Sequence, residues 1–159
     1  FPGCTPAETK KRLDECAKSM ASGRFYEWVF VRHWDTWEDG RRSHLFVAQV
    51  PQGLAGGAHP AAVAKPSVSG AIDVMAAMDA DTPSLPWGGP EEIAFTPDSR
   101  GIVFAARDAG REEAWSTDFD LYLAPLDGSS QPQCLTDENR AWDSYPTSPP
   151  TARRSLTWR

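Results

Sequence analysis

Apolar residues recur at three- and four-residue intervals near the start of the chain, which predicts one amphipathic helix. The residues of this apolar stripe are Leu13, Cys16, Ala17 and Met20. Thr5-Pro6-Ala7-Glu8 has the pattern of a capping box, with Thr5 as N-cap and proline at the first helical position. Gly23 suits the end of the element. We therefore expect a helix over residues 6–22 that lies on a larger body.

A β pattern replaces the helical one after Gly23. Residues 25–33 are rich in aromatic and β-branched side chains, and residues 45–50 form a second apolar run. Asp39-Gly40 lies between the two runs, and Asp-Gly is a strong turn signal. These features predict a hairpin over residues 26–50. Residues 51–70 are dominated by Gly, Ala, Pro and Ser, which predicts a long surface loop.

Four short apolar runs follow and predict four antiparallel strands. They cover residues 92–95, 101–106, 120–126 and about 133–136. The turn after the first run contains Pro97-Asp98, which favours a tight type I turn, and Asp127-Gly128 ends the third run. A unit of this length, ~40–45 residues, is typical of one blade of a β-propeller.

The pattern then begins again, because residues 143–159 align without a gap on residues 91–107. We therefore predict an all-β fold, a partial β-propeller of about two to three four-stranded antiparallel blades, with one inserted α-helix near the N-terminus. Its parts would be the end of one blade with the helix (1–50), a loop (51–70), a second blade (71–140) and the start of a third (141–159). A ring cut at both ends cannot close.

Composition favours turn-rich β structure over a helical bundle. The 159 residues include 14 Pro and 12 Gly, which break the chain often. The net charge of −6 and the dispersed Lys and Arg disfavour a nucleic-acid partner. No apolar stretch approaches a membrane span, and Phe1 is not followed by the basic and apolar segments of a signal peptide. We expect no contact with a membrane.

The three cysteines do not have the spacing of a zinc site, and we expect neither a metal nor a cofactor. Cys4 and Cys16 could be reduced thiols, or they could form a disulfide across a short loop, which would suit an oxidising compartment. Cys134 is expected to be a free thiol in a strand. Histidines 33, 44 and 59 have no nucleophile at a recognisable spacing, so structural or solvated roles are expected for them.

Two segments carry a family resemblance. Residues 30–37 with 39–47, and residues 87–99, look like stretches of bacterial dipeptidyl-peptidase-type members of the prolyl oligopeptidase family of serine peptidases. Residues 1–4 resemble the strand end before the inserted helix there. The elements Asp120-Leu121-Tyr122 and Thr96-Pro97-Asp98 are also similar to those of TolB-type periplasmic propellers. In the third expected blade, Ser148-Pro149-Pro150-Thr151-Ala152-Arg153-Arg154 stands where a Ser-Pro-Asp-Gly-like turn is usual.

The resemblance implies a propeller that covers an α/β-hydrolase domain of the same parent chain and gates peptide substrates, with dipeptides or short peptides cleaved from peptide N-termini. It also implies a periplasmic or secreted location. The nucleophile of such an enzyme lies in a G-x-S-x-G elbow, which this sequence lacks. No catalytic residue is therefore expected here. A non-catalytic TolB-like binding propeller is the alternative, and an independent small β protein is a third possibility. A G-x-S-x-G motif about one domain downstream would favour the peptidase.

Four residues are candidates for facing substrate. Trp34 and Trp37 flank an exposed turn, whereas the other tryptophans are expected to fill gaps between sheets. Glu91 and Glu92 invite comparison with the paired glutamates that hold a substrate amino terminus in some dipeptidyl peptidases. Their place at the start of an expected strand argues against that role.

Overall fold

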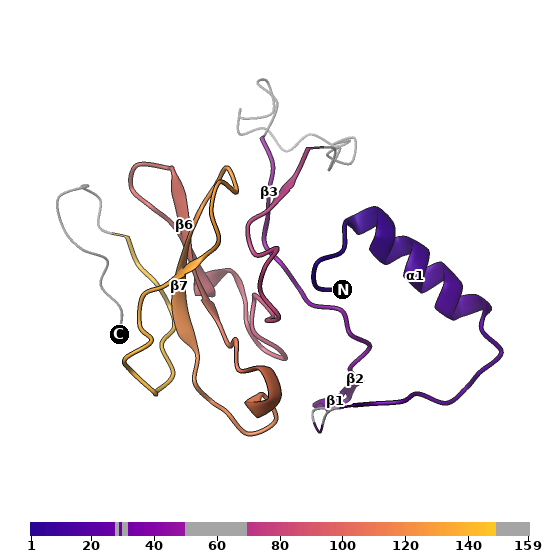
Figure 1. The fold of residues 1–159 in the computed structure, drawn as a ribbon. Helices are drawn as coiled ribbons and strands as arrows, with labels where there is room; N and C mark the ends of the chain where they lie inside the picture. The colour runs from indigo at the N-terminus through magenta and orange to yellow at the C-terminus, as the bar shows by residue number, and fades with distance from the viewer. Residues whose placement is uncertain (28, 30–31, 50–69, 149–159) are drawn as a thin grey trace, which may run out of the picture.

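A computed structural model describes residues 1–27, 29, 32–49 and 70–148 of the chain (Figure 1). The described part is mostly sheet with one α-helix. Its elements are α1 (Pro6–Lys18), β1 (Arg32–His33), β2 (Thr36–Trp37), β3 (Phe46–Val47), β4 (Ile72–Asp73), the 3-10 turn η1 (Pro90–Glu92), β5 (Ile93–Phe95), β6 (Gly101–Ala106), the 3-10 turn η2 (Gly110–Glu112), β7 (Asp120–Pro125) and β8 (Gln133–Cys134). None of the described helices is long and apolar enough to cross a membrane.

Helix α1 begins at the predicted capping box. The Thr5 hydroxyl accepts from the Glu8 amide at 3.2 Å, and the Glu8 carboxylate accepts from the Thr5 amide at 2.7 Å. The helix ends at Lys18, four residues earlier than expected, because Ser19 is extended and its hydroxyl accepts from the Ala21 amide. None of the residues of α1 is buried, so the helix does not lie on a larger body in the way we expected.

None of the three cysteines is in a disulfide in this structure. Cys4 precedes the N-cap of α1, and Cys16 lies in its last turn. Twelve residues at the helical rise separate them by roughly 18 Å, whereas a disulfide needs Cα atoms within about 7 Å. The disulfide alternative assumed a short loop between Cys4 and Cys16, and the helix excludes it. Cys134 is a free thiol in β8, as expected.

The predicted hairpin over residues 26–50 is wrong. Strand β1 pairs with β2 through a turn at Trp34-Asp35, and β3 pairs with β4 from beyond residue 69. Asp39-Gly40 does not join paired strands. It forms a local turn, in which the Asp39 carboxylate accepts from the Arg41 amide at 3.1 Å. The partners of Phe46 and Val47 are thus distant in sequence. The expected loop over residues 51–70 lies almost wholly outside the described residues.

Strands β5, β6, β7 and β8 form one four-stranded antiparallel sheet in chain order, and this confirms the four strands predicted from the apolar runs. In the turn between β5 and β6, the Ser99 amide donates to the Thr96 carbonyl at 2.9 Å. Ser99 has a φ of 56°, a left-handed conformation that completes the turn. The β6 and β7 strands have six residues each and form the centre of the sheet.

Both faces of this sheet contain buried side chains. On one face, β6 and β7 residues pack against the segment that follows β4 and runs beside the sheet (Figure 1). This core consists of Val74, Met75, Met78, Ala80, Ile102, Phe104, Ala106 and Ala124. Val103, Ala105 and Leu121 are buried on the opposite face. Every residue of β6 is therefore buried.

The other described strands form two small sheets, β1-β2 and β3-β4, of two strands each. The start of the expected third blade falls largely on residues 149–159, which lie outside the described residues. At residue 148 the chain has returned to the sheet, since the Ser148 hydroxyl donates to the Phe95 carbonyl at 2.7 Å.

Candidate functional site

Arg42 is at the centre of a cluster of charged side chains at one end of the sheet. Its Nε lies 2.7 Å from the carboxylate of Asp79, its Nη1 lies 3.0 Å from that of Asp81, and its Nη2 lies 2.6 Å from that of Glu113. Glu113 accepts from both terminal nitrogens, a bidentate pair. The Arg42 side chain is only 12% exposed. This contact joins the segment before β3 to the segment after β4 and to the connection between β6 and β7.

Arg107 adds a second cation beside Glu113. It donates to the Ser116 carbonyl at 2.7 Å, lies 3.7 Å from Glu113, and lies 5.1 Å from the ring centre of Phe119. Burial lowers the pKa of Arg107. For Arg42, burial alone would also lower the pKa, but the hydrogen bonds to Glu113 and Asp79 outweigh it and raise the value.

The charges of this cluster do not cancel. Arg42 and Arg107 supply two positive charges, and Asp79, Asp81 and Glu113 supply three negative ones. His33 adds none at neutral pH, because burial and then the charge of Arg107 lower its pKa. Glu38 and Asp108 also interact electrostatically with Arg42 and Glu113, and burial raises the pKa of both carboxyls. Acidic side chains therefore outnumber basic ones in the cluster.

A small crevice opens next to the cluster. It is lined by His33, Asp81, Ser84, Leu85, Arg107, Glu113 and Phe119. Its volume is about 10 Å³, roughly the space of one water molecule, so a ligand does not enter it as it stands.

Three exposed tryptophans lie in the segments that contribute His33 and Leu85 to this crevice. Trp34 and Trp87 meet edge to face with ring centres 5.6 Å apart, and their exposed fractions are 68% and 75%. Trp37 is 55% exposed and lies beside Tyr26 and under the guanidinium of Arg32. The two predicted site residues Trp34 and Trp37 are thus exposed around the β1-β2 turn. Trp87, Trp115 and Trp142, which we expected to pack between sheets, are exposed, and Trp87 lies beside Trp34.

Glu92 fixes the loop that carries Trp87. Its carboxylate accepts from the Ser84 amide and the Ser84 hydroxyl, both at 2.7 Å, and the residue is 4% exposed. Glu91 is exposed. Both glutamates lie in η1 and not at the start of a strand as we expected, and Glu92 is directed into its own loop. The structure therefore does not bring the two carboxylates together on one exposed surface.

Gly88 closes the same loop, because its amide donates to the Ser84 carbonyl at 2.7 Å. A Cβ atom at this position would clash with the backbone nitrogen and oxygen of Ser84. We expect Gly88→Ala to lower the free energy of unfolding by about 1–3 kcal/mol, since the backbone must shift to admit the methyl group. Urea unfolding measures this. Gly23→Ala is the control, because that position has nothing within 4 Å. Equal stability of the two variants would contradict the tight packing.

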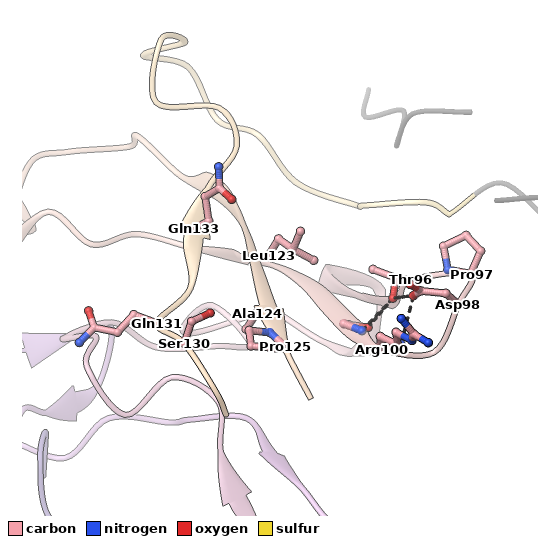
Figure 2. Close-up of a pocket in the computed structure, with 11 residues that line it drawn as sticks. Thr96, Pro97, Asp98, Arg100, Leu123, Ala124, Pro125, Ser130, Gln131 and Gln133 are labelled. Carbon is pink, nitrogen blue, oxygen red and sulfur yellow. Dashed lines mark hydrogen bonds between the residues drawn. The ribbon is translucent and has the colours of Figure 1, made fainter. Parts of the chain in front are cut away.

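A larger cleft of about 410 Å³ lies at the β5-β6 turn, where Gln131 and Gln133 line one side and the turn lines another (Figure 2). Its lining residues are Thr96, Pro97, Asp98, Arg100, Gly101, Leu123, Ala124, Pro125, Ser130, Gln131 and Gln133. The Thr96 hydroxyl lies 2.6 Å from the Asp98 carboxylate, which stabilises the turn. None of the four candidate residues from the sequence lines this cleft. The described residues contain no group of His, Cys, Asp and Glu side chains that could hold a metal ion.

Curated relatives of the chain carry a common name. A dipeptidyl-peptidase 5 of Porphyromonas gingivalis is 26% identical over 87% of this chain, and one of Porphyromonas endodontalis is 29% identical over 96% of it. A probable dipeptidyl-peptidase 5 of Aspergillus terreus is 30% identical over 74% of the chain. These similarities support a relationship to dipeptidyl peptidases.

The chain spans only 18%, 20% and 15% of the lengths of these three relatives. No family model matches the chain. No solved structure matches it either.

Proposed function

We propose that this chain is part of the β-propeller of a serine dipeptidyl peptidase of the prolyl oligopeptidase family, where it gates the access of peptides to an α/β-hydrolase domain of the same protein. The observation that carries the proposal is the similarity, at 26–30% identity and over 74–96% of the chain, to proteins named dipeptidyl-peptidase 5. The periplasmic or secreted location implied by the family resemblance is part of the same proposal.

The four-stranded sheet supports the propeller assignment. A propeller blade is a four-stranded antiparallel sheet whose strands follow one another in chain order, as β5 to β8 do. Each blade packs between two neighbours, so a blade has apolar side chains on both faces. The burial of Phe104 on one face and Val103 on the other fits this arrangement.

The described histidines suit structural roles, which agrees with catalysis by another domain. His44 is paired with Asp73 at 2.8 Å, and its side chain is only 8% exposed. His33 lies beside the Arg42 cluster, in the wall of the small crevice. A general base must reach the proton that it removes from a nucleophile. Ser84 lines the same crevice as His33, but its hydroxyl donates to the Glu92 carboxylate at 2.7 Å. His59 lies outside the described residues.

Hydrolysis assays test the proposal. We expect the full-length protein to release the chromophore from dipeptidyl chromogenic substrates and a serine-directed reagent to abolish this activity, while residues 1–159 alone release none. A full-length protein without such activity would contradict the peptidase proposal and favour the TolB-like binding propeller. Activity of residues 1–159 alone would contradict the assignment of catalysis to another domain.

A further inference from the structure

We infer that Trp34 and Trp87 form a contact site for the peptide ligand and take one of its bulky apolar side chains. This inference rests on the proposed function for the nature of the ligand. It adds the residues that hold the peptide in this part of the protein.

The rings of Trp34 and Trp87 are largely exposed to solvent. Large aromatic side chains are normally covered, and aromatic residues that remain exposed together mark contact surfaces. Trp34 and Trp87 are 68% and 75% exposed although their rings touch each other. Trp37 differs, because Arg32 and Tyr26 cover part of it. The Trp34-Trp87 pair therefore has apolar area left for a ligand.

The backbone holds both rings in place before any ligand arrives. Trp34 has a φ of 54°, a left-handed conformation that the two-residue turn between β1 and β2 requires. Trp87 is carried by the loop that Glu92 and Gly88 tie to Ser84. A rigid pair loses little conformational entropy when it binds, which favours affinity.

The surroundings favour a peptide over an anionic ligand. The crevice lined by Ser84 and Leu85 joins the loop of Trp87 to the Arg42 cluster, in which acidic side chains outnumber basic ones. The free amino group of a peptide complements that charge, whereas a phosphate has no positive group to do so. A few polar groups beside an apolar surface are also the usual composition of a site for a small ligand.

Calorimetry of dipeptide binding to the full-length protein tests the inference. The probes are Phe-Ala, Ala-Phe and Ala-Ala. Trp34→Asn keeps a residue type that accepts a left-handed backbone, and Trp87→Ala removes the second ring. Phe46→Ala is the matched control, because Phe46 is 46% exposed on β3, away from the β1-β2 turn in Figure 1.

We expect each tryptophan variant to weaken the binding of at least one phenylalanine-containing dipeptide by about tenfold. We expect the affinity for Ala-Ala to change less than about twofold, and Phe46→Ala to bind all three probes like the wild type. Trp87→Phe should recover most of the lost affinity. If Trp34→Asn fails to fold, Trp87→Ala decides alone.

Wild-type affinities in the tryptophan variants, or equal losses for all three dipeptides, would overturn the inference. So would the absence of dipeptide binding to the wild-type protein. The hydrolysis assay separates this result from a failure of the proposed function. If the full-length protein hydrolyses substrates but the variants show unchanged dipeptide preference, the contact site is contradicted and the proposed function stands. If the wild type binds the phenylalanine-containing dipeptides selectively but hydrolyses no substrate, the peptidase proposal is contradicted and the contact site stands.

Discussion

Replacing Arg42 with methionine should lower the free energy of unfolding by about 3–5 kcal/mol. Arg42 is 12% exposed and contacts three carboxylates, two of which, Asp81 and Glu113, are 10% exposed. Removing one partner of a buried ion pair leaves uncompensated charge away from water, and this costs far more than the pair contributes as a unit. The variant would also release the segment before β3 from the connection between β6 and β7.

The neighbouring arginine supplies a matched control for this experiment. Arg41 pairs with Asp39 at 2.6 Å, but its side chain is 52% exposed. Exposed pairs contribute about 0–1 kcal/mol, so Arg41→Met should change stability by no more than that. Urea unfolding of both variants in the full-length protein gives the comparison. Equal losses would show that the Arg42 cluster does not tie these segments together.

Phe104→Ala should cost about 3–5 kcal/mol in the stability of the sheet. Phe104 is fully buried at 0% exposure, and its ring stacks on Tyr122 with centres 5.9 Å apart. Its partner on the neighbouring strand β5 is Ile93. The Phe104 side chain belongs to the core between the sheet and the segment after β4. Truncation leaves a cavity that the surrounding strands can fill only in part.

Hydrogen exchange of the β6 amides measures the loss of sheet stability in Phe104→Ala. Phe95→Ala is the control, because Phe95 lies on the adjacent strand but is 59% exposed, and its truncation should change stability by about 0.5 kcal/mol or less. If β6 exchanges at the same rate in both variants, the core does not lie where the structure places it.

The elements that sequence predicted well are those fixed by neighbouring residues. The Thr5-Glu8 capping box and the Thr96-Ser99 turn depend on hydrogen bonds between residues three apart in the chain. The β6 strand was predicted with its observed bounds, because a short apolar run between turn residues is a local signal. Such features need no knowledge of the remainder of the fold.

Long-range partners were not predicted. Arg42 and Glu113 are 71 positions apart, and no periodic pattern connects them. One signal was present, since Asp79 and Asp81 interrupt an otherwise apolar stretch and carboxylates in such a stretch need a buried partner. The partner of Phe46 and Val47 was misassigned for the same reason, because β4 lies beyond residue 69.

Exposure of Trp87 could also have been foreseen in part. Pro86, Gly88 and Gly89 surround it, and such residues place a side chain in a turn and not in a strand. Which tryptophan it meets depends on the positions of β1 and β2 relative to the loop after residue 81. That relation is tertiary, and composition does not encode it.

An experimental structure of the full-length protein tests the central proposal most directly. We expect β5, β6, β7 and β8 to form one blade of a closed propeller, with further blades packed on the faces that contain Phe104 and Val103. We also expect an α/β-hydrolase domain with a Ser-Asp-His triad beside the ring. A full-length structure in which this sheet has no blade on either face, or in which no hydrolase domain is present, would contradict the proposal.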